Sequence, residues 1–356
     1  MAIMRCLLPG STHRCAMVFR TPGLVYMLLT VFLFFLSAFA IYIACEFFVN
    51  GVEWVGCRLN LGATAVGTVL AAFGTALPES AVTFVAVVFG DTPEQKDIGV
   101  GAALGGPLVL ATLAYAVVGI MLWRQHRAGQ HCKIDVGQER LARDQAWFMV
   151  IFVVKIGLGL VVFAWKPWLG FLFLLVYGYY VKRELSTDEG SMVMEELEPL
   201  KLRRSNPSMF WAVLQTVLAL LAIAVASHIF VRQIESIGTW VGIAPHIAAL
   251  LLAPVATELP EIMNAIIWTR QGKARLALAN ISGSMMIQAT IPSAMAIFMT
   301  PWILDTPLLV AGGLTLLSIG VLWLLFRRGA MRVPMLAGVS GFYLVFAGFV
   351  GLYFVR

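Results

Sequence analysis

The chain has 356 residues, of which 60% are hydrophobic and 12% charged, and its formal net charge is +6. So few polar side chains cannot cover so much apolar surface, so the composition excludes a soluble domain. The positive residues lie in a few loops between apolar runs, as the orientation of a membrane protein requires, so the charge does not indicate a nucleic-acid partner.

Apolar runs long enough to cross a bilayer recur along the whole chain. The first, Leu24 to Val49, is predicted to be a retained helix, because no small-residue cleavage site follows a short apolar run in the first 22 residues. We therefore predict an all-α membrane protein with about ten transmembrane helices. The predicted spans cover residues 24–50, 60–90, 98–123, 145–165, 167–183, 208–231, 242–269, 275–300, 307–326 and 333–355.

Residues 184–207 form the one long polar stretch and are predicted to be a cytoplasmic linker. They separate a first membrane repeat, residues 1–183, from a second, residues 208–356. Aromatic side chains near the span ends are predicted to anchor the protein at the membrane interface. These are Trp165, Trp168, Tyr177 and Trp302.

The distribution of Lys and Arg predicts the orientation of the chain. Ten spans place 17 of these residues on the side that holds the linker and 7 on the side that holds both termini. The richer side is predicted to be cytoplasmic, which puts both termini outside. The lack of a large regulatory domain fits a prokaryotic inner (plasma) membrane.

The sequence repeats itself at an offset of 182 residues. Thr75-x-Leu77-Pro78-Glu79 matches Thr257-x-Leu259-Pro260-Glu261, and Gly90 matches Gly272 in the same register. Four extra residues follow in the first copy, after which Gly105 matches Gly283. Because each copy holds five spans, an odd number, the two copies are predicted to cross the membrane in opposite directions, as in many secondary transporters.

The two Leu-Pro-Glu segments carry the chemistry. A proline inside a span frees the carbonyl about one turn earlier, here near Gly74 and Ala256. Such a carbonyl is tolerated in a membrane where it lines a polar cavity, and a carboxylate there needs a cation or a proton. Glu79 and Glu261, with Thr75 and Thr257, therefore predict an all-oxygen site for a hard cation such as Ca²⁺ or Na⁺.

The segments GTALPES at 74–80 and ATELPEI at 256–262 resemble the alpha-repeats of the sodium/calcium exchanger superfamily, the calcium/cation antiporters. The family pattern continues on the next helix, and the second copy keeps part of it in residues 279–284. The resemblance implies an antiporter fold that binds cations between spans 2, 3, 7 and 8. It adds Glu258, a third carboxylate where the family has serine, and Ser284 and Gln288 to the candidate ligands.

The first copy departs from the pattern. Ala76 stands where the family has serine, and span 3 reads Gly101-Ala102-Ala103-Leu104-Gly105-Gly106-Pro107, without a side-chain ligand. The site is therefore expected to be rich in the second half and poor in the first. Lys155, inside span 4, either pairs with a site carboxylate, substitutes for a coupling cation, or has a structural role in which it snorkels or pairs elsewhere.

Sodium/calcium exchange by alternating access is the function that these features favour. Calcium or another divalent cation exchanged against protons is the alternative within transport, and a transport-dead receptor or scaffold with the exchanger fold is the alternative of another class. No catalytic motif indicates an enzyme, and no cofactor is expected, since Ca²⁺ and Na⁺ or H⁺ are substrates. The expected partners are inorganic cations and the lipid bilayer, and the sequence does not indicate an oligomeric state.

Overall fold

The computed structural model describes residues 23–58, 76–127, 138–187, 199–202, 208–270, 272, 274–329 and 331–355. Helices account for nearly all of these residues, and none of them lies in a strand, so the predicted all-α class is confirmed. In chain order the helices are α1 (Leu24–Arg58), α3 (Leu77–Phe89), α4 (Pro93–Val109), the π-helical turn η2 (Leu110–Ala114), α5 (Tyr115–Arg127), α6 (Gln138–Gly159), the 3₁₀ turn η3 (Lys166–Trp168), α7 (Leu169–Thr187), α8 (Met209–Val241), α9 (Pro245–Thr257), α10 (Leu259–Arg270), α11 (Ala274–Met299), α12 (Thr306–Arg327), α13 (Val333–Gly338) and α14 (Ser340–Val355).

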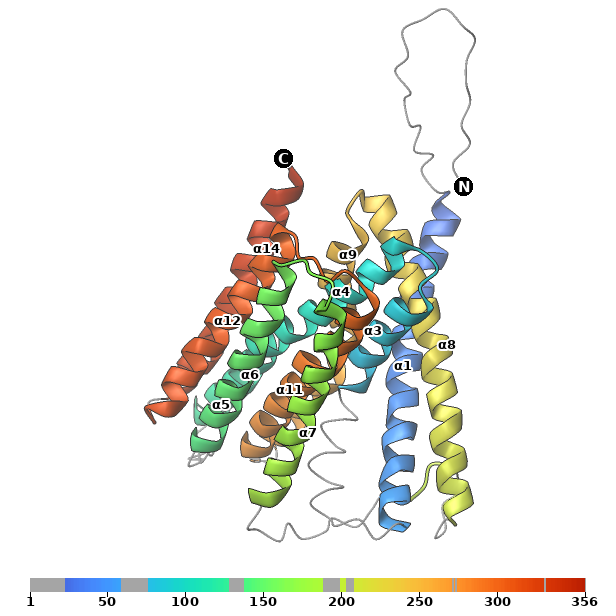
Figure 1. Ribbon diagram of the computed structural model, residues 1–356. Helices are drawn as coiled ribbons and strands as arrows, with labels where there is room; N and C mark the ends of the chain where they lie inside the picture. Colours follow the sequence, from blue (N-terminus) through green and yellow to red (C-terminus); the bar gives the residue numbers. More distant parts are fainter. Residues whose placement is uncertain are drawn as a thin grey trace, which may run out of the picture.

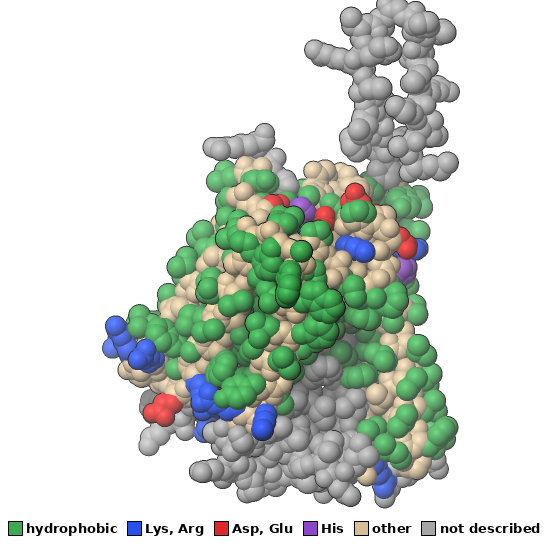
Figure 2. Space-filling model, viewed as in Figure 1, with side chains coloured by type: hydrophobic (Ala, Val, Ile, Leu, Met, Phe, Trp, Pro, Cys, Tyr) green, Lys and Arg blue, Asp and Glu red, His purple; other side chains and the backbone are tan. Residues whose placement is uncertain are grey.

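Six helical segments of the described chain are long and apolar enough to cross a membrane. They are Leu24–Phe48, Pro93–Gln125, Met209–Val241, Ala277–Met299, Thr306–Arg327 and Val333–Tyr353. In the face drawn in Figure 2, charged side chains gather at the two ends of the molecule, and the belt between them is mostly hydrophobic. An apolar belt between two polar ends is the surface that a bilayer requires, so the protein is an integral, multi-pass membrane protein.

The two halves run in opposite directions. Figure 1 shows α1 descending from the end where the chain begins, while α8, its counterpart in the repeat, rises from the opposite end. The pair α6 and α12 is antiparallel in the same way, and α1 begins at the end where α14 finishes. This arrangement confirms the predicted inverted repeat.

The helices form two packed groups. One apolar core joins α1 and α8 to α3, α9 and one side of α4, and a larger core joins α4 through α7 to α9 through α14. Phe34 of α1 stacks on Phe230 of α8 with ring centroids 4.8 Å apart. Much of the surface of α1 and α8 faces outward, because only 28% of the most apolar 18-residue stretch of each helix is buried. These two long helices therefore form a pair at one side of the bundle (Figure 1).

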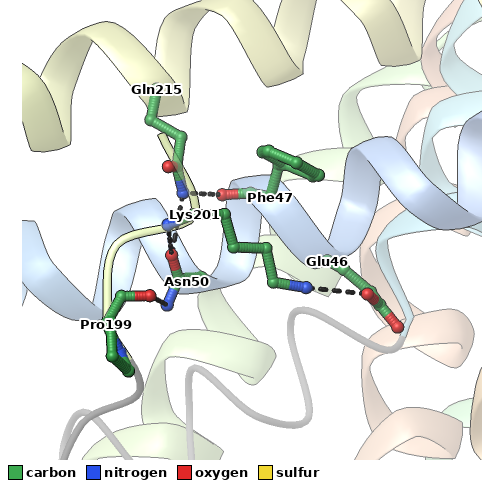
Figure 3. A network of polar contacts seen from close by, with 6 residues as sticks. All are labelled: Glu46, Phe47, Asn50, Pro199, Lys201 and Gln215. Carbon is green, nitrogen blue, oxygen red and sulfur yellow. Dashed lines mark hydrogen bonds and ion pairs between the residues drawn. The ribbon is translucent and has the colours of Figure 1, made fainter. Parts of the chain in front are cut away.

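Part of the predicted linker is fastened to this pair, as Figure 3 shows. Asn50 of α1 accepts a hydrogen bond from the Lys201 backbone N–H at 3.1 Å, and Gln215 of α8 accepts one from the Leu202 N–H at 2.9 Å. The Lys201 ammonium lies 2.7 Å from a Glu46 carboxylate oxygen. Residues 199–202 thus bridge the ends of α1 and α8 that lie far from the chain termini.

One predicted interfacial anchor is wrong. Trp165 and Trp168 are 78% and 68% exposed, as expected of side chains that face lipid, but Trp302 is fully buried. The indole N–H of Trp302 donates to the Lys155 carbonyl at 3.0 Å. Its position between α11 and α12 resembles a span end in the sequence, but the chain turns inward there and the indole packs beneath α6.

Candidate functional site

The second Leu-Pro-Glu segment lies at a break between two half-helices. α9 ends at Thr257, α10 begins at Leu259, and Glu258 between them caps α9 by donating its N–H to the Pro254 carbonyl at 3.1 Å. Pro260 is thus the second residue of a new helix, where its missing N–H costs nothing. The chain thus interrupts the helix at this segment, and the proline begins the second half-helix.

The first segment is built in the same way from its described residues. Ala76 caps α3, which begins at Leu77 with Pro78 in its first turn. Glu79 and Glu261 therefore both lie in the first turn of a helix, where the exposed backbone N–H groups favour negative charge. Both side chains are fully buried. The fold thus offers each carboxylate a helix N-terminus in place of water.

A chain of hydrogen bonds joins the two halves. Thr257 Oγ1 lies 2.9 Å from Glu79 Oε2, 3.1 Å from the Ala253 carbonyl oxygen and 3.4 Å from Glu258 Oε1. Gln288 Nε2 on α11 lies 2.9 Å and 3.1 Å from the two oxygens of Glu258. We call Glu79, Thr257, Glu258 and Gln288 the site cluster. Its members are at most 2% exposed.

Two oxygens of the site cluster have no hydrogen-bond donor among the described residues. They are Glu79 Oε1 and Gln288 Oε1, both buried. A buried acceptor without a donor costs about 1–3 kcal/mol. A cation bound at these oxygens would remove that cost, so the cluster has the chemistry of a cation site.

Helix α4 closes the cluster with backbone rather than with side chains. A Cβ on Gly106 would lie 2.8 Å from Gln288 Oε1 and 2.9 Å from Glu258 Oε1. Gly101 and Gly105 lie against α9, where a Cβ would meet the His246 and Leu250 carbonyl oxygens at 2.0 Å and 2.7 Å. Small residues four apart let membrane helices approach closely. The glycine run of span 3 is therefore a packing surface, and its small-xxx-small spacing is the sequence signal for it.

The structure places the other predicted ligands as follows. Glu261 and Ser284 are fully buried on α10 and α11, and Thr75 lies outside the described residues. Within the described part of the chain, no three His, Cys, Asp or Glu side chains are close enough to hold one metal ion. Ion ligands at the cluster therefore have to include hydroxyl, amide or carbonyl oxygens beside the carboxylates.

A second buried polar group escaped the sequence analysis. Tyr115 of α5 lies 2.8 Å from Ser282 Oγ of α11, and Gln145 of α6 donates to both hydroxyls. Ser282 belongs to the residue 279–284 segment that retains the exchanger pattern. Its partners could not be found from the sequence, because Tyr115 and Gln145 have no shared spacing with it.

The comparisons with known proteins agree with this architecture. The family model described as sodium/calcium exchanger protein matches residues 29–183 and 211–355. The two matches begin 182 residues apart, which is the offset of the sequence repeat. Together they cover most of the chain.

One relative and two solved structures illustrate the range of similarity. The uncharacterised membrane protein MJ0091 of Methanocaldococcus jannaschii is 21% identical over 271 residues, which are 76% of this chain and 82% of that protein. The sodium-calcium exchanger NCX_Mj has a TM-score of 0.57 and 18% identity, over 89% of this chain and 97% of that one. The H⁺/Ca²⁺ exchanger CAX has a TM-score of 0.61 and 16% identity, over 89% and 86%.

The TM-scores of 0.57 and 0.61 show that the chain shares the fold of these two exchangers, but identities of 18% and 16% show no more than the fold. The family itself is shown by the family model. Because the family model matches both halves of the chain, the chain belongs to the sodium/calcium exchanger family.

Proposed function

We propose that the protein is a secondary active cation antiporter that exchanges calcium against sodium by alternating access. Membership of a transporter family supports the class of function, and the site cluster supports the cation. The proposed ligands are Glu79 and Glu261 as primary carboxylates, with Thr75, Thr257, Glu258, Ser284 and Gln288 completing the set.

The single observation that carries this proposal is the buried cluster that joins the halves. Thr257 Oγ1 lies within 3.4 Å of a carboxylate oxygen of both Glu79 and Glu258, so two carboxylates face one hydroxyl. Two buried carboxylates this close need a positive partner. Carboxylate, hydroxyl and amide oxygens suit hard cations such as calcium and sodium.

The hydrogen-bond donors of the cluster suit carboxylates that bind a metal ion. Gln288 donates to both oxygens of Glu258, and Thr257 is placed to donate to Glu79. Donors of this kind stabilise the ionised carboxylate, which is the form that binds a metal ion. Calcium/proton exchange is the alternative function within transport, because adjacent carboxylates can also share a proton.

The fold supports a two-sided mechanism. Because the cluster takes Glu79 from the first half and its other members from the second, a movement of one half against the other would open it to alternate sides. We propose that the first repeat spans residues 1–183, the linker 184–207 and the second repeat 208–356. We further propose that the linker faces the cytoplasm and both termini face outward, in a prokaryotic inner membrane.

Calcium flux in proteoliposomes tests the proposal, with a sodium gradient imposed first and a proton gradient second. Sodium-driven calcium movement that Glu261→Gln abolishes is the expected result. Glu94→Gln, which neutralises an exposed carboxylate at the start of α4, is the control and should transport normally. Calcium movement driven only by protons would establish calcium/proton exchange instead. No calcium flux under either gradient would contradict calcium exchange.

A further inference from the structure

Lys155 is a buried lysine that is not among the proposed ion ligands. It lies in α6, and its side chain is fully buried in the core. A lysine in the interior of a membrane protein is costly and needs a specific partner. Its surroundings therefore indicate what the positive charge does.

The ammonium is seated on helix α4, beside the site cluster. Lys155 Nζ donates to the Ala103 carbonyl oxygen at 2.7 Å. Ala103 lies one turn before Gly106, whose backbone closes the cluster. Lys155 and Glu79 also lie within range of each other's charge. The lysine thus places a positive charge on α4, one turn from the residue whose backbone closes the cluster.

The seat of the ammonium is built from aromatic rings. Lys155 Nζ lies 5.0 Å from the ring centroid of Phe152 and 5.8 Å from that of Trp302. Aromatic faces attract a cation, so both rings favour the charged form. Trp302 has a φ of 48°, in the left-handed region that a bulky residue rarely adopts. Backbone strain of this kind persists where the surroundings impose it, often at functional sites.

The repeat shows what the lysine replaces. At the register in which Gly105 matches Gly283, Gly106 corresponds to Ser284 and Leu110 to Gln288. At these two positions the second half has polar side chains on α11, whereas the first half has Gly106 on α4 and Leu110 on η2. Lys155 contacts α4 one turn before Gly106, at the Ala103 carbonyl.

We propose that Lys155 is a tethered cation that permanently takes the place of one monovalent ion in the first half of the site, so that exchange is electroneutral. The inference rests on the proposed antiport function. Ionised Glu79, Glu258 and Glu261 carry three negative charges, and Lys155 reduces the net charge to minus two. One divalent cation or two monovalent cations balance that charge, so a full cycle moves no net charge.

The steady-state calcium gradient at a fixed sodium gradient tests this stoichiometry. Reconstituted vesicles are clamped at several membrane potentials with valinomycin and potassium. In the wild type, the calcium gradient should not change with potential. In Lys155→Gln a third monovalent ion should enter the cycle, and the gradient should then change about tenfold for every 59 mV. Lys155→Arg should behave as the wild type.

Lys166→Gln is the matched control, because it neutralises a second lysine that contacts Trp302. Lys166, the first residue of η3, donates from its Nζ to the Trp302 carbonyl at 2.9 Å. It should leave the gradient insensitive to potential. A gradient that varies with potential in the wild type overturns the proposal even if no lysine variant folds. A gradient that stays insensitive in an active Lys155→Gln protein also overturns it. No calcium gradient in the wild type under either ion removes the proposed function itself, and this inference with it.

Discussion

The two halves of the ion site share a backbone but differ in their side chains. In both halves a helix begins at the Leu-Pro-Glu segment and buries a glutamate in its first turn, Glu79 in one and Glu261 in the other. The second half adds Thr257, Glu258 and Gln288 to the cluster, whereas the first adds the glycines of α4. The inverted repeat has therefore kept the helix N-termini that stabilise carboxylates, while the ligands around them have diverged.

This difference shows that backbone geometry is the stricter requirement. Position 76 holds alanine and position 258 holds glutamate, yet each lies directly before the start of a helix. A helix start depends on the proline and the local turn, which both copies retain. The side chain at that position is free to vary and sets the charge of the site.

Glu258→Ala should have the largest effect among the variants that compare the halves, because it gives the second half the residue of the first. Loss of one buried carboxylate and of its bonds to Gln288 should weaken calcium binding by roughly 10–100-fold. Isothermal titration of the purified protein measures the change. Glu258→Gln, which keeps the shape, separates the effect of charge from that of volume. Equal affinities for the wild type and Glu258→Ala would show that Glu258 is not a ligand.

Gly106→Ala should have a smaller effect, from the other side of the cluster. The new Cβ would press on Gln288 and Glu258 at 2.8 Å and 2.9 Å, and overpacking of this kind costs about 1–3 kcal/mol. Calcium affinity should fall, and the melting temperature should fall with it. Gly157→Ala on α6 is the control, since nothing lies within 4 Å of its Cβ. If Gly106→Ala and Gly157→Ala behaved alike, α4 would not close the site.

The smallest effect concerns a histidine–aspartate contact in the second half. His246 Nε2 lies 2.7 Å from Asp305 Oδ2, and the first copy has Thr64 at the position of His246. Burial opposes the charged form of Asp305, but the hydrogen bond and charge of His246 outweigh it, so the pKa of Asp305 lies below its usual value.

A lowered carboxylate pKa stabilises the fold above the unfolded-state value, about 3.9, and this stability is lost as the pH falls through the folded-state pKa. Asp305→Asn should therefore lower stability by at most about 1 kcal/mol at neutral pH. The difference from the wild type should vanish in acid. Thermal unfolding in detergent between neutral and acidic pH measures it. Asp305 is also the N-cap of α12 and accepts a hydrogen bond from the Leu308 N–H at 3.2 Å. A difference that persists at the most acidic pH would assign the effect to this cap instead.

The sequence predicts the fold well because its signals are local. Long apolar runs identify the spans, and the 182-residue offset identifies the inverted halves. Local signals are weaker where the chain turns inward. Trp302 resembles an interfacial residue but is buried.

The site is only partly predictable for the same reason. The motif identifies Glu79, Thr257, Glu258 and Gln288 as candidates, but their contacts depend on packing between residues as far apart as Glu79 and Thr257. The seat of Lys155 on the Ala103 carbonyl likewise requires α6 and α4 to be placed in space. Sequence spacing carries no information about either contact.

Calcium–calcium exchange tests the central claim most directly, because it does not depend on the identity of the counter-ion. Vesicles loaded with labelled calcium are diluted into buffer with or without unlabelled calcium, for the wild type and Glu79→Gln. External calcium should accelerate the loss of label in the wild type and have no effect in the variant. Efflux from wild-type vesicles that is the same with and without external calcium, or an acceleration that survives in Glu79→Gln, would contradict antiport through this site.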